Sequence, residues 1–186
     1  MARPIHIATP KESLLNQSRN TKMLSTSIYK KKSRTIYEVM LSELKFPTTT
    51  SIILSTFPAL SEWHKQEIAL YPQIYYMSKN EKGKDPSLSE NDGEFKVLVG
   101  DDVAYRYEII ESLGKGTFGQ VLKVFDHKLN QFSALKIIKN KPRYLEQALV
   151  EVEILKFLQE KSPENKQNFV KFESNFTFRN HIVLNI

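Results

Sequence analysis

The sequence predicts an α+β fold in which a five-stranded antiparallel sheet carries one helix, inserted after the third strand. Three observations lead to this prediction. Between residues 105 and 138, three segments rich in β-forming residues are separated by short turns, which is typical of an antiparallel meander. From residue 144 to residue 159, apolar residues recur with helical spacing. Two further strand-like segments follow, at 169–176 and 177–186.

Local patterns predict the individual elements. Residues 95–99 form a short alternating strand, residues 105–113 a longer one, and residues 120–125 and 132–138 flank the polar turn 126–131. The helix should present one apolar face, made of Leu145, Leu149, Val152, Leu155 and Leu158.

The composition is that of an ordinary globular protein with room for one core. The chain has 186 residues, of which 40% are hydrophobic and 26% charged. It has no run of 18 apolar residues, and its start has no apolar stretch typical of a signal peptide, so we expect a cytoplasmic chain without a membrane partner. The absence of cysteine excludes disulfides and thiolate zinc sites, and the four histidines lack metal-ligand spacing, so no metal site is predicted.

Positive charge is concentrated at the beginning of the chain. The first 50 residues hold nine Lys or Arg against three Asp or Glu, and the other 136 residues are balanced at 18 against 18. We interpret residues 1–34 as a disordered, solvated basic tail. The alternative to a solvated tail is binding of a nucleic acid, an anionic membrane or a nuclear import receptor by the basic cluster Lys30, Lys31, Lys32 and Arg34. Without aromatic interleaving or a known binding motif, we expect no nucleic-acid partner.

Residues 35–104 are predicted to form an accessory segment with a linker. Short helices are expected at 36–44 and 48–54. The aromatic-rich stretch 60–80 should contain a helix that ends at its Tyr-Pro pair, and its aromatic density predicts docking on a neighbour. Turn signals at 81–93 predict a domain boundary there.

Three of the six glycines fall within six residues, in Gly114-Lys115-Gly116-Thr117-Phe118-Gly119-Gln120-Val121. This stretch fits the pattern G-x-G-x-x-G-x-V. Alone, G-x-G-x-x-G also occurs in dinucleotide-binding folds and in hairpins that bind nothing. A dinucleotide-binding loop must open a helix, whereas residues 120–125 continue as a strand. The glycines should therefore turn a β-hairpin whose backbone N–H groups can point at phosphates.

A lysine and a glutamate complete the pattern. Lys136 lies in the apolar strand 132–138 and needs a partner to offset its desolvation. The helix offers Glu151 and Glu153, and the pattern E-x-x-I-L selects Glu151. Such a pair holds a lysine over the α- and β-phosphates of ATP. Singly, Lys136 would be a snorkelling surface lysine and Glu151 a solvated helix residue, but the order and spacing of all three elements favour a protein kinase.

Most of the chain after residue 60 resembles a known family. Residues 105–186 resemble the amino-terminal lobe of a eukaryotic protein kinase, and specifically of the dual-specificity tyrosine-regulated kinases, the DYRK family. The resemblance depends on YRYEIIESLGKGTFGQVLKVFDHKLNQFSALKIIKNKPRYLEQALVEVEILKFL and on NFTFRNHI. NDGEFKVLVGDDVAYRYE resembles the family's homology box, and EWHKQEIALYPQIYYMSKN resembles the accessory segment of class II members.

The resemblance implies a kinase that autophosphorylates an activation-loop tyrosine while maturing, assisted by the accessory segment, and then phosphorylates Ser or Thr of protein substrates. It implies ATP and Mg²⁺ as cofactors, and it assigns Lys136 to the α- and β-phosphates and Glu151 to holding Lys136. Ile186 stands where the family usually has a bulky aromatic residue, and Thr117 where it usually has Ser. The implied nucleotide-binding residues are Leu113, Gly114, Lys115, Gly116, Thr117, Phe118, Gly119, Gln120, Val121, Ala134 and Lys136.

Other motifs of the family do not occur in these 186 residues. They are the H-R-D-x-x-x-x-N catalytic loop, the D-F-G magnesium site and A-P-E. The catalytic base and the magnesium ligands therefore have no counterpart here, and we expect these residues alone to transfer no phosphate. Two alternatives to the ATP-binding part of an active kinase stay open. One is a natural, non-catalytic form that docks partners through residues 60–80, and the other is a fragment from an incomplete gene model.

Overall fold

The computed structural model describes residues 35–79, 93–161 and 169–186. The predicted tail 1–34 and nearly all of the predicted linker 81–93 lie outside these ranges. Apart from Thr35, the described residues belong to one compact unit that begins at Ile36. Its helices are α2 (Ile36–Glu43), α3 (Thr50–Thr56), α4 (Glu62–Ile68) and α5 (Pro142–Lys161). Its strands are β1 (Thr48–Thr49), β2 (Gln73–Ile74), β3 (Asp102–Val103), β4 (Tyr107–Lys115), β5 (Gly119–Asp126), β6 (Gln131–Ile138), β7 (Ser174–Phe178) and β8 (His181–Asn185).

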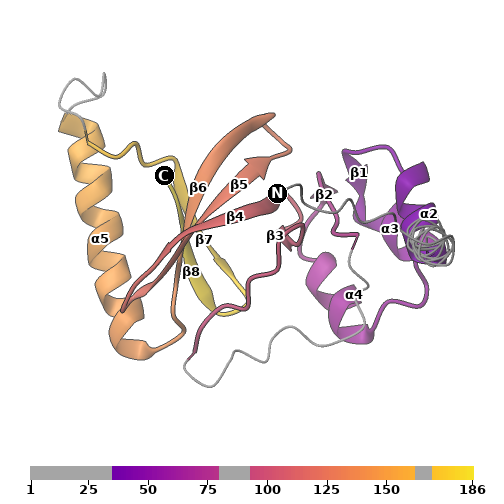
Figure 1. The fold of residues 1–186 in the computed structure, drawn as a ribbon, viewed down its shortest axis with the longest axis horizontal. Coiled ribbons are helices and arrows are strands. Elements are labelled where there is room, and N and C mark those ends of the chain that lie inside the picture. Colours follow the sequence, from indigo (N-terminus) through magenta and orange to yellow (C-terminus); the bar gives the residue numbers. More distant parts are fainter. Residues whose placement is uncertain (1–34, 80–92, 162–168) are drawn as a thin grey trace, which may run out of the picture. The chain divides into compact units, whose positions relative to one another are not determined.

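The main sheet confirms the predicted antiparallel α+β fold. Its strand order is β3-β4-β5-β6-β8-β7, and all neighbours are antiparallel. The predicted meander is the run β4-β5-β6, and α5 follows it along the chain before β7 and β8 (Figure 1). The two-residue strand β3 adds a sixth member at one edge. The second sheet consists only of β1 and β2.

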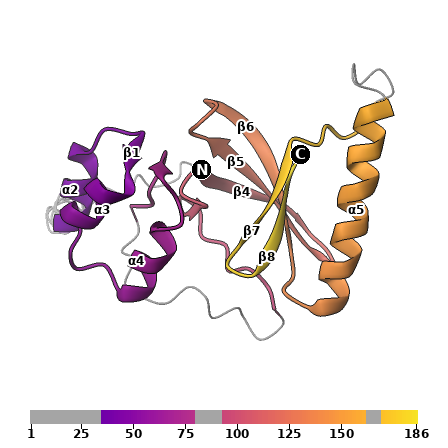
Figure 2. The ribbon, with the colours of Figure 1, turned by 180° about the vertical axis from the view of Figure 1, so that it is seen from behind.

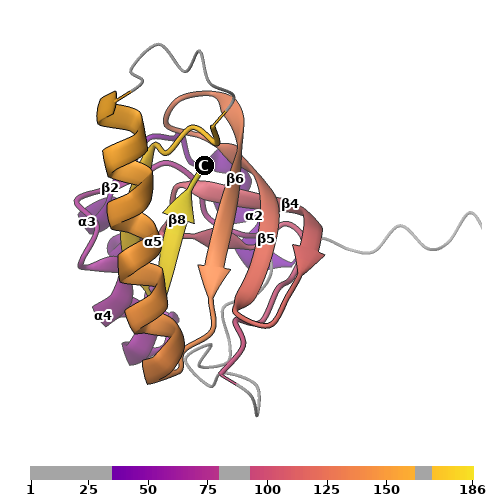
Figure 3. The same cartoon turned by 90° about the vertical axis from the view of Figure 1, so that its left-hand side faces the viewer.

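The two faces of the main sheet carry different cores. Along β6, Leu135 and Ile137 are buried in a cluster on one face, whereas Lys136 between them points to the other. Helix α5 lies along that second face (Figure 3). Ala148 and Val152 of α5 are buried there against Ile138 and Leu184, together with Tyr144 and Leu155.

The helical face that packs on the sheet includes Val152 and Leu155 of the predicted face, together with Tyr144 and Ala148, which were not predicted. Leu149, expected on the apolar face, is 54% exposed. The residues that pack on the sheet are spaced as 144, 148, 152 and 155, which places position 149 outside the contact stripe. The helix also begins earlier than predicted, at Pro142, because proline suits the first helical turn.

One strand prediction is wrong, and the last two strands differ from the predicted bounds. Residues 95–99 do not pair in a ladder; Phe95 is buried in the core on the face of the sheet opposite α5, and its carbonyl accepts a hydrogen bond from the Gln120 side chain instead. The strand predicted at 169–176 begins at Ser174 and continues to Phe178. Arg179 and Asn180, predicted inside the last strand, form a two-residue turn with φ of 47° and 63°.

The accessory segment has its own core. Ser61 caps α4 by accepting a hydrogen bond from the His64 N–H, and α4 ends at Ile68, before the Tyr-Pro pair as predicted. Residues of α2, α3, α4 and β2 form a buried cluster with Tyr105, which lies two residues before the sheet strand β4. The N–H groups of Tyr75 and Tyr76 both donate to the Tyr105 carbonyl, at 2.9 and 3.1 Å. In Figure 2 these helices lie on the side of the sheet away from α5.

Among the described residues, no helix combines the length and the apolar character that a membrane crossing requires.

Candidate functional site

The glycine-rich sequence forms the turn between β4 and β5, as predicted. The Gly116 N–H donates to the Gly119 carbonyl at 2.8 Å and closes the turn. A Cβ atom at Gly119 would lie 2.2 Å from the Ile137 carbonyl oxygen, so this position requires glycine for the close approach of β5 to β6. A Cβ at Gly114 would meet nothing within 4 Å. The backbone at Gly114 and Gly116 is therefore open to a ligand.

The tip of the loop is held by its neighbours. The Lys139 N–H, just after β6, donates to the Phe118 carbonyl at 2.9 Å. The Phe118 ring packs edge-on against Tyr144 in the first turn of α5, with 5.4 Å between ring centroids. Phe118 nevertheless stays 47% exposed, so the tip is anchored on one side and open on the other.

Lys136 and Glu151 form an ion pair. The Lys136 Nζ lies 2.6 Å from Glu151 Oε1 and 2.7 Å from Oε2, so the contact is bidentate on the carboxylate. The side chains are 26% and 40% exposed, which places the pair at the border between core and solvent. Lys136 is directly opposite Val121 in the β5–β6 ladder. The ammonium group is thus fixed on the α5 face, beside the strand that leaves the glycine loop.

Three of the predicted nucleotide-binding residues are apolar and lie on the three strands of the meander. Val121 and Ala134 are half-buried on β5 and β6, and Leu113, near the end of β4, is 55% exposed. Ala134 exchanges two backbone hydrogen bonds with Ile186, at 3.1 and 2.9 Å. An apolar surface is therefore present next to the loop and the ion pair, and Ile186 lies at its border.

The described residues contain no group of three or more His, Asp or Glu side chains that could hold a metal ion. The donors present suit a different ligand. Exposed backbone N–H groups at a glycine turn and one fixed ammonium group are donors for anionic oxygens, and they fit the phosphates of a nucleotide.

One charged residue beneath the loop was missed in the sequence. Glu94 forms ion pairs with Lys115, which precedes the loop turn, and with Lys139, at 2.9 Å from its Nζ. The side-chain hydrogen bond from Lys115 is the main cause that lowers the pKa of Glu94, followed by the one from Lys139. No pattern in the sequence marks this position, because the residues it joins are 21 and 45 positions away.

The aromatic residues of segment 60–80 contact the chain's own sheet region. Tyr71 packs on Tyr105 with 5.2 Å between ring centroids, and Tyr76 stacks on His127 at 4.4 Å. Burial is the main cause that raises the pKa of Tyr71 to about 12, so its phenol stays neutral. A groove of about 460 Å³ lies between α4 and the β7–β8 turn; its lining residues are Trp63, Gln66, Glu67, Leu70, Tyr71, Thr177, Phe178, Arg179 and Asn180.

Comparison with known proteins identifies protein kinases that are similar to two thirds or more of this chain. The chain is 37% identical over 133 residues to dual specificity tyrosine-phosphorylation-regulated kinase 3 of Mus musculus, which is 67% of this chain and 23% of that protein. It is 39% identical over 140 residues to the DYRK-family kinase pom1 of Schizosaccharomyces pombe, covering 70% and 13%. It is 36% identical over 158 residues to the human dual specificity tyrosine-phosphorylation-regulated kinase 4, covering 77% and 30%.

No family model matches the chain. The chain spans less than a third of the length of each of these three relatives.

Proposed function

Because the chain belongs to the DYRK family of protein kinases, we propose that it binds ATP at the glycine hairpin and is the nucleotide-binding part of a dual-specificity protein kinase. The whole enzyme would autophosphorylate a tyrosine and phosphorylate Ser or Thr of protein substrates. The single observation that carries the proposal is the Lys136–Glu151 ion pair beside an open glycine turn. These are the two parts with which kinases position phosphates.

Each part has a defined task in this proposal. The backbone of residues 115–119 would cover the phosphates, with the N–H groups at its tip donating to phosphate oxygens, and the Lys136 ammonium would neutralise charge on the α- and β-phosphates. Glu151 would keep the lysine in place between α5 and the sheet. Leu113, Val121 and Ala134 would enclose the adenine. Magnesium, which bridges phosphate oxygens in kinases, would need ligands other than these residues.

Nucleotide binding by the full chain tests the proposal. A fluorescent ATP analogue is titrated into the wild-type chain and competed with unlabelled ATP. Lys136→Met removes the ammonium and should weaken binding about tenfold or more, as expected for a lost charge-assisted hydrogen bond. Glu151→Gln should weaken binding less, because the lysine keeps its charge and loses only its anchor.

Lys128→Met is the matched control, since Lys128 lies in the turn at the opposite end of the β5–β6 hairpin. It removes the same charge and should leave the affinity unchanged. If the wild-type chain and a folded Lys136→Met chain bind ATP with equal affinity, the proposed site is refuted.

A further inference from the structure

Residues 93–97, called the strap below, cross the face of the sheet opposite α5. Their start is tied to the end of β6, where the Asn140 N–H donates to the Gly93 carbonyl at 2.8 Å. Gly93 has φ of 69°, and a Cβ there would lie 2.8 Å from the Asn140 oxygen, so the tie requires glycine. Phe95 is buried in the core of this face, and its ring lies 6.0 Å from that of Phe178. The strap is therefore a fixed part of the fold.

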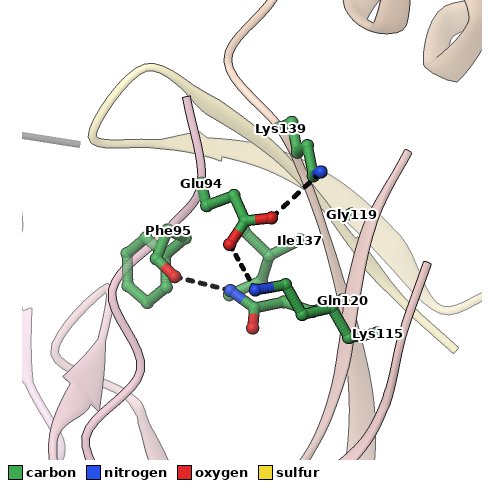
Figure 4. A pocket seen from close by; sticks show the side chains of 7 residues that line it. All are labelled: Glu94, Phe95, Lys115, Gly119, Gln120, Ile137 and Lys139. Carbon is green, nitrogen blue, oxygen red and sulfur yellow. Dashed lines mark hydrogen bonds and ion pairs between the residues drawn. The ribbon is translucent and has the colours of Figure 1, made fainter. Parts of the chain in front are cut away.

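From this fixed base two polar contacts reach the glycine hairpin. The Gln120 Nε2 donates to the Phe95 carbonyl at 2.6 Å. The carboxylate of Glu94 lies between two ammonium groups, pairing with Lys115 through Oε2 and with Lys139 through Oε1. Figure 4 shows Glu94 between the two lysines, with Gln120 reaching to the strap beside them. Glu94 thus connects both sides of the loop base, since Lys115 ends β4 and Lys139 follows β6.

The β4 side of the loop has few ladder contacts of its own, whereas the β5 side is paired with β6. The β4–β5 register shifts between Ser112 and Gly114, and beyond the shift only two pairs remain, Gly114 with Val121 and Lys115 with Gln120. Strand ends beyond an irregularity open more easily than the middle of a ladder. Lys115 and Gln120 both reach the strap, on the face away from Lys136, so a contact there leaves the phosphate side free.

We propose that Glu94 is a positioning residue for the nucleotide: by pairing with Lys115 and Lys139 from the fixed strap, it holds the glycine hairpin in its binding conformation. This inference rests on the proposed ATP site. Glu94 itself would not touch the nucleotide, because its carboxylate lies on the opposite face of the sheet from Lys136.

A purely electrostatic role for Glu94 predicts the opposite change in ATP affinity. If Glu94 acted only through its negative charge, its removal would reduce repulsion of the phosphates and tighten ATP binding. Holding the loop predicts weaker binding, since a hairpin that opens more often is competent for a smaller fraction of the time. The direction of the affinity change therefore separates the two roles.

The first experiment follows amide hydrogen exchange of the full chain without nucleotide, so its result does not depend on the ATP site. Glu94→Gln should speed exchange in residues 114–120 about threefold, which corresponds to the loss of a partly exposed ion pair. Lys115→Gln should speed exchange in the same direction but no more than this, because it breaks only one of the two pairs of Glu94. The double variant should exchange no faster than Glu94→Gln, because both changes break the Glu94–Lys115 contact. The Lys115 side chain is 60% exposed, so Lys115→Gln should leave the fold intact. It therefore tests the contact even if Glu94→Gln destabilises the fold.

Glu111→Gln is the matched control for exchange. It breaks the pair with Lys123, at 3.0 Å, between the same two strands, and should leave residues 114–120 unchanged. Unchanged exchange at 114–120 in both Glu94→Gln and Lys115→Gln would overturn the proposal.

The second experiment measures affinity for the fluorescent ATP analogue. Glu94→Gln should weaken it about threefold, in proportion to the loosened loop, whereas Glu94→Asp, which keeps the charge, should lie between that variant and wild type. Tighter binding by Glu94→Gln would overturn the positioning role. If the wild-type chain binds no nucleotide but exchange responds as expected, the ATP site fails and the Glu94 contact stands.

Discussion

Glu67 and Arg179 form a buried ion pair that joins α4 of the accessory segment to the β7–β8 turn across 112 residues of sequence. Arg179 Nε lies 2.7 Å from Glu67 Oε1, and its Nη2 lies 3.0 Å from Oε2. The Tyr105 hydroxyl donates to the same carboxylate at 2.7 Å, and the guanidinium lies 5.2 Å from the Trp63 ring centroid. Arg179 makes these contacts from the two-residue turn, where its φ of 47° is uncommon for arginine.

Breaking this pair should destabilise the whole chain. The side chains of Arg179 and Glu67 are only 8% and 9% exposed, so Glu67→Gln leaves a buried guanidinium without its counter-charge. We expect the free energy of unfolding to fall by about 3 kcal/mol. Urea unfolding followed by the fluorescence of Trp63, the single tryptophan, measures it.

Glu62→Gln on the same helix is the control. Its pair with Lys65 is solvent-exposed and should contribute at most about 0.5 kcal/mol. Equal unfolding midpoints for the two variants would mean that the buried pair contributes no more than the exposed one.

The glycines of the hairpin should differ in what they tolerate. Gly119→Ala forces a methyl group against the Ile137 carbonyl and should cost about 1–3 kcal/mol through the shift of β5 from β6. Gly114→Ala meets open space and should change the free energy of unfolding by less than about 0.5 kcal/mol. Thermal unfolding of both variants compares them; a similar loss in both would contradict the close approach seen at Gly119.

Stability should fall in mild acid through His181. Burial is the main cause that lowers the pKa of His181 below 6.5, outweighing the hydrogen bond between its Nδ1 and the Ile138 carbonyl at 2.7 Å. Because the folded pKa is depressed, the unfolded chain takes up the proton first. The contribution of neutral His181 to the free energy of unfolding is fully present above pH 6.5, and it is lost as the pH falls toward the pKa of His181 in the folded chain.

Melting temperatures between pH 7.5 and pH 5.5 test this, with His181→Asn as the comparison. The variant should lose less of its melting temperature over this range than wild type does. Identical pH slopes would exclude His181 as the cause.

Residues 1–186 alone should transfer no phosphate, because they contain no H-R-D or D-F-G motif to supply a base and metal ligands. Radiolabelled ATP with magnesium and a generic protein substrate should give no incorporation above that of Lys136→Arg. Labelling by the wild-type chain that Lys136→Arg abolishes would disprove this expectation.

Much of the fold follows from local sequence patterns. The β-rich segments separated by short turns predict β4, β5 and β6, and the helical period predicts α5. The stretches wrongly predicted as strand, residues 95–99 and 169–173, share one physical cause. Both are largely apolar, but their backbone groups make isolated hydrogen bonds, such as that of the Phe95 carbonyl with the Gln120 side chain and that of the Glu173 N–H with the Asn185 carbonyl. Apolar content alone does not distinguish an extended strap from a strand.

The sequence by itself indicated the family, through its resemblance to the DYRK kinases. It also predicted the glycine hairpin and the pairing of Lys136 with Glu151, because these depend on residue types at short spacings. Only the tertiary structure decided that Glu94 supports the hairpin and that Glu67 joins the accessory segment to the sheet. Both act through ion pairs between residues far apart along the chain, and such pairs leave no periodic signal. They form only when packing brings the charges together and removes enough water for the contact to matter.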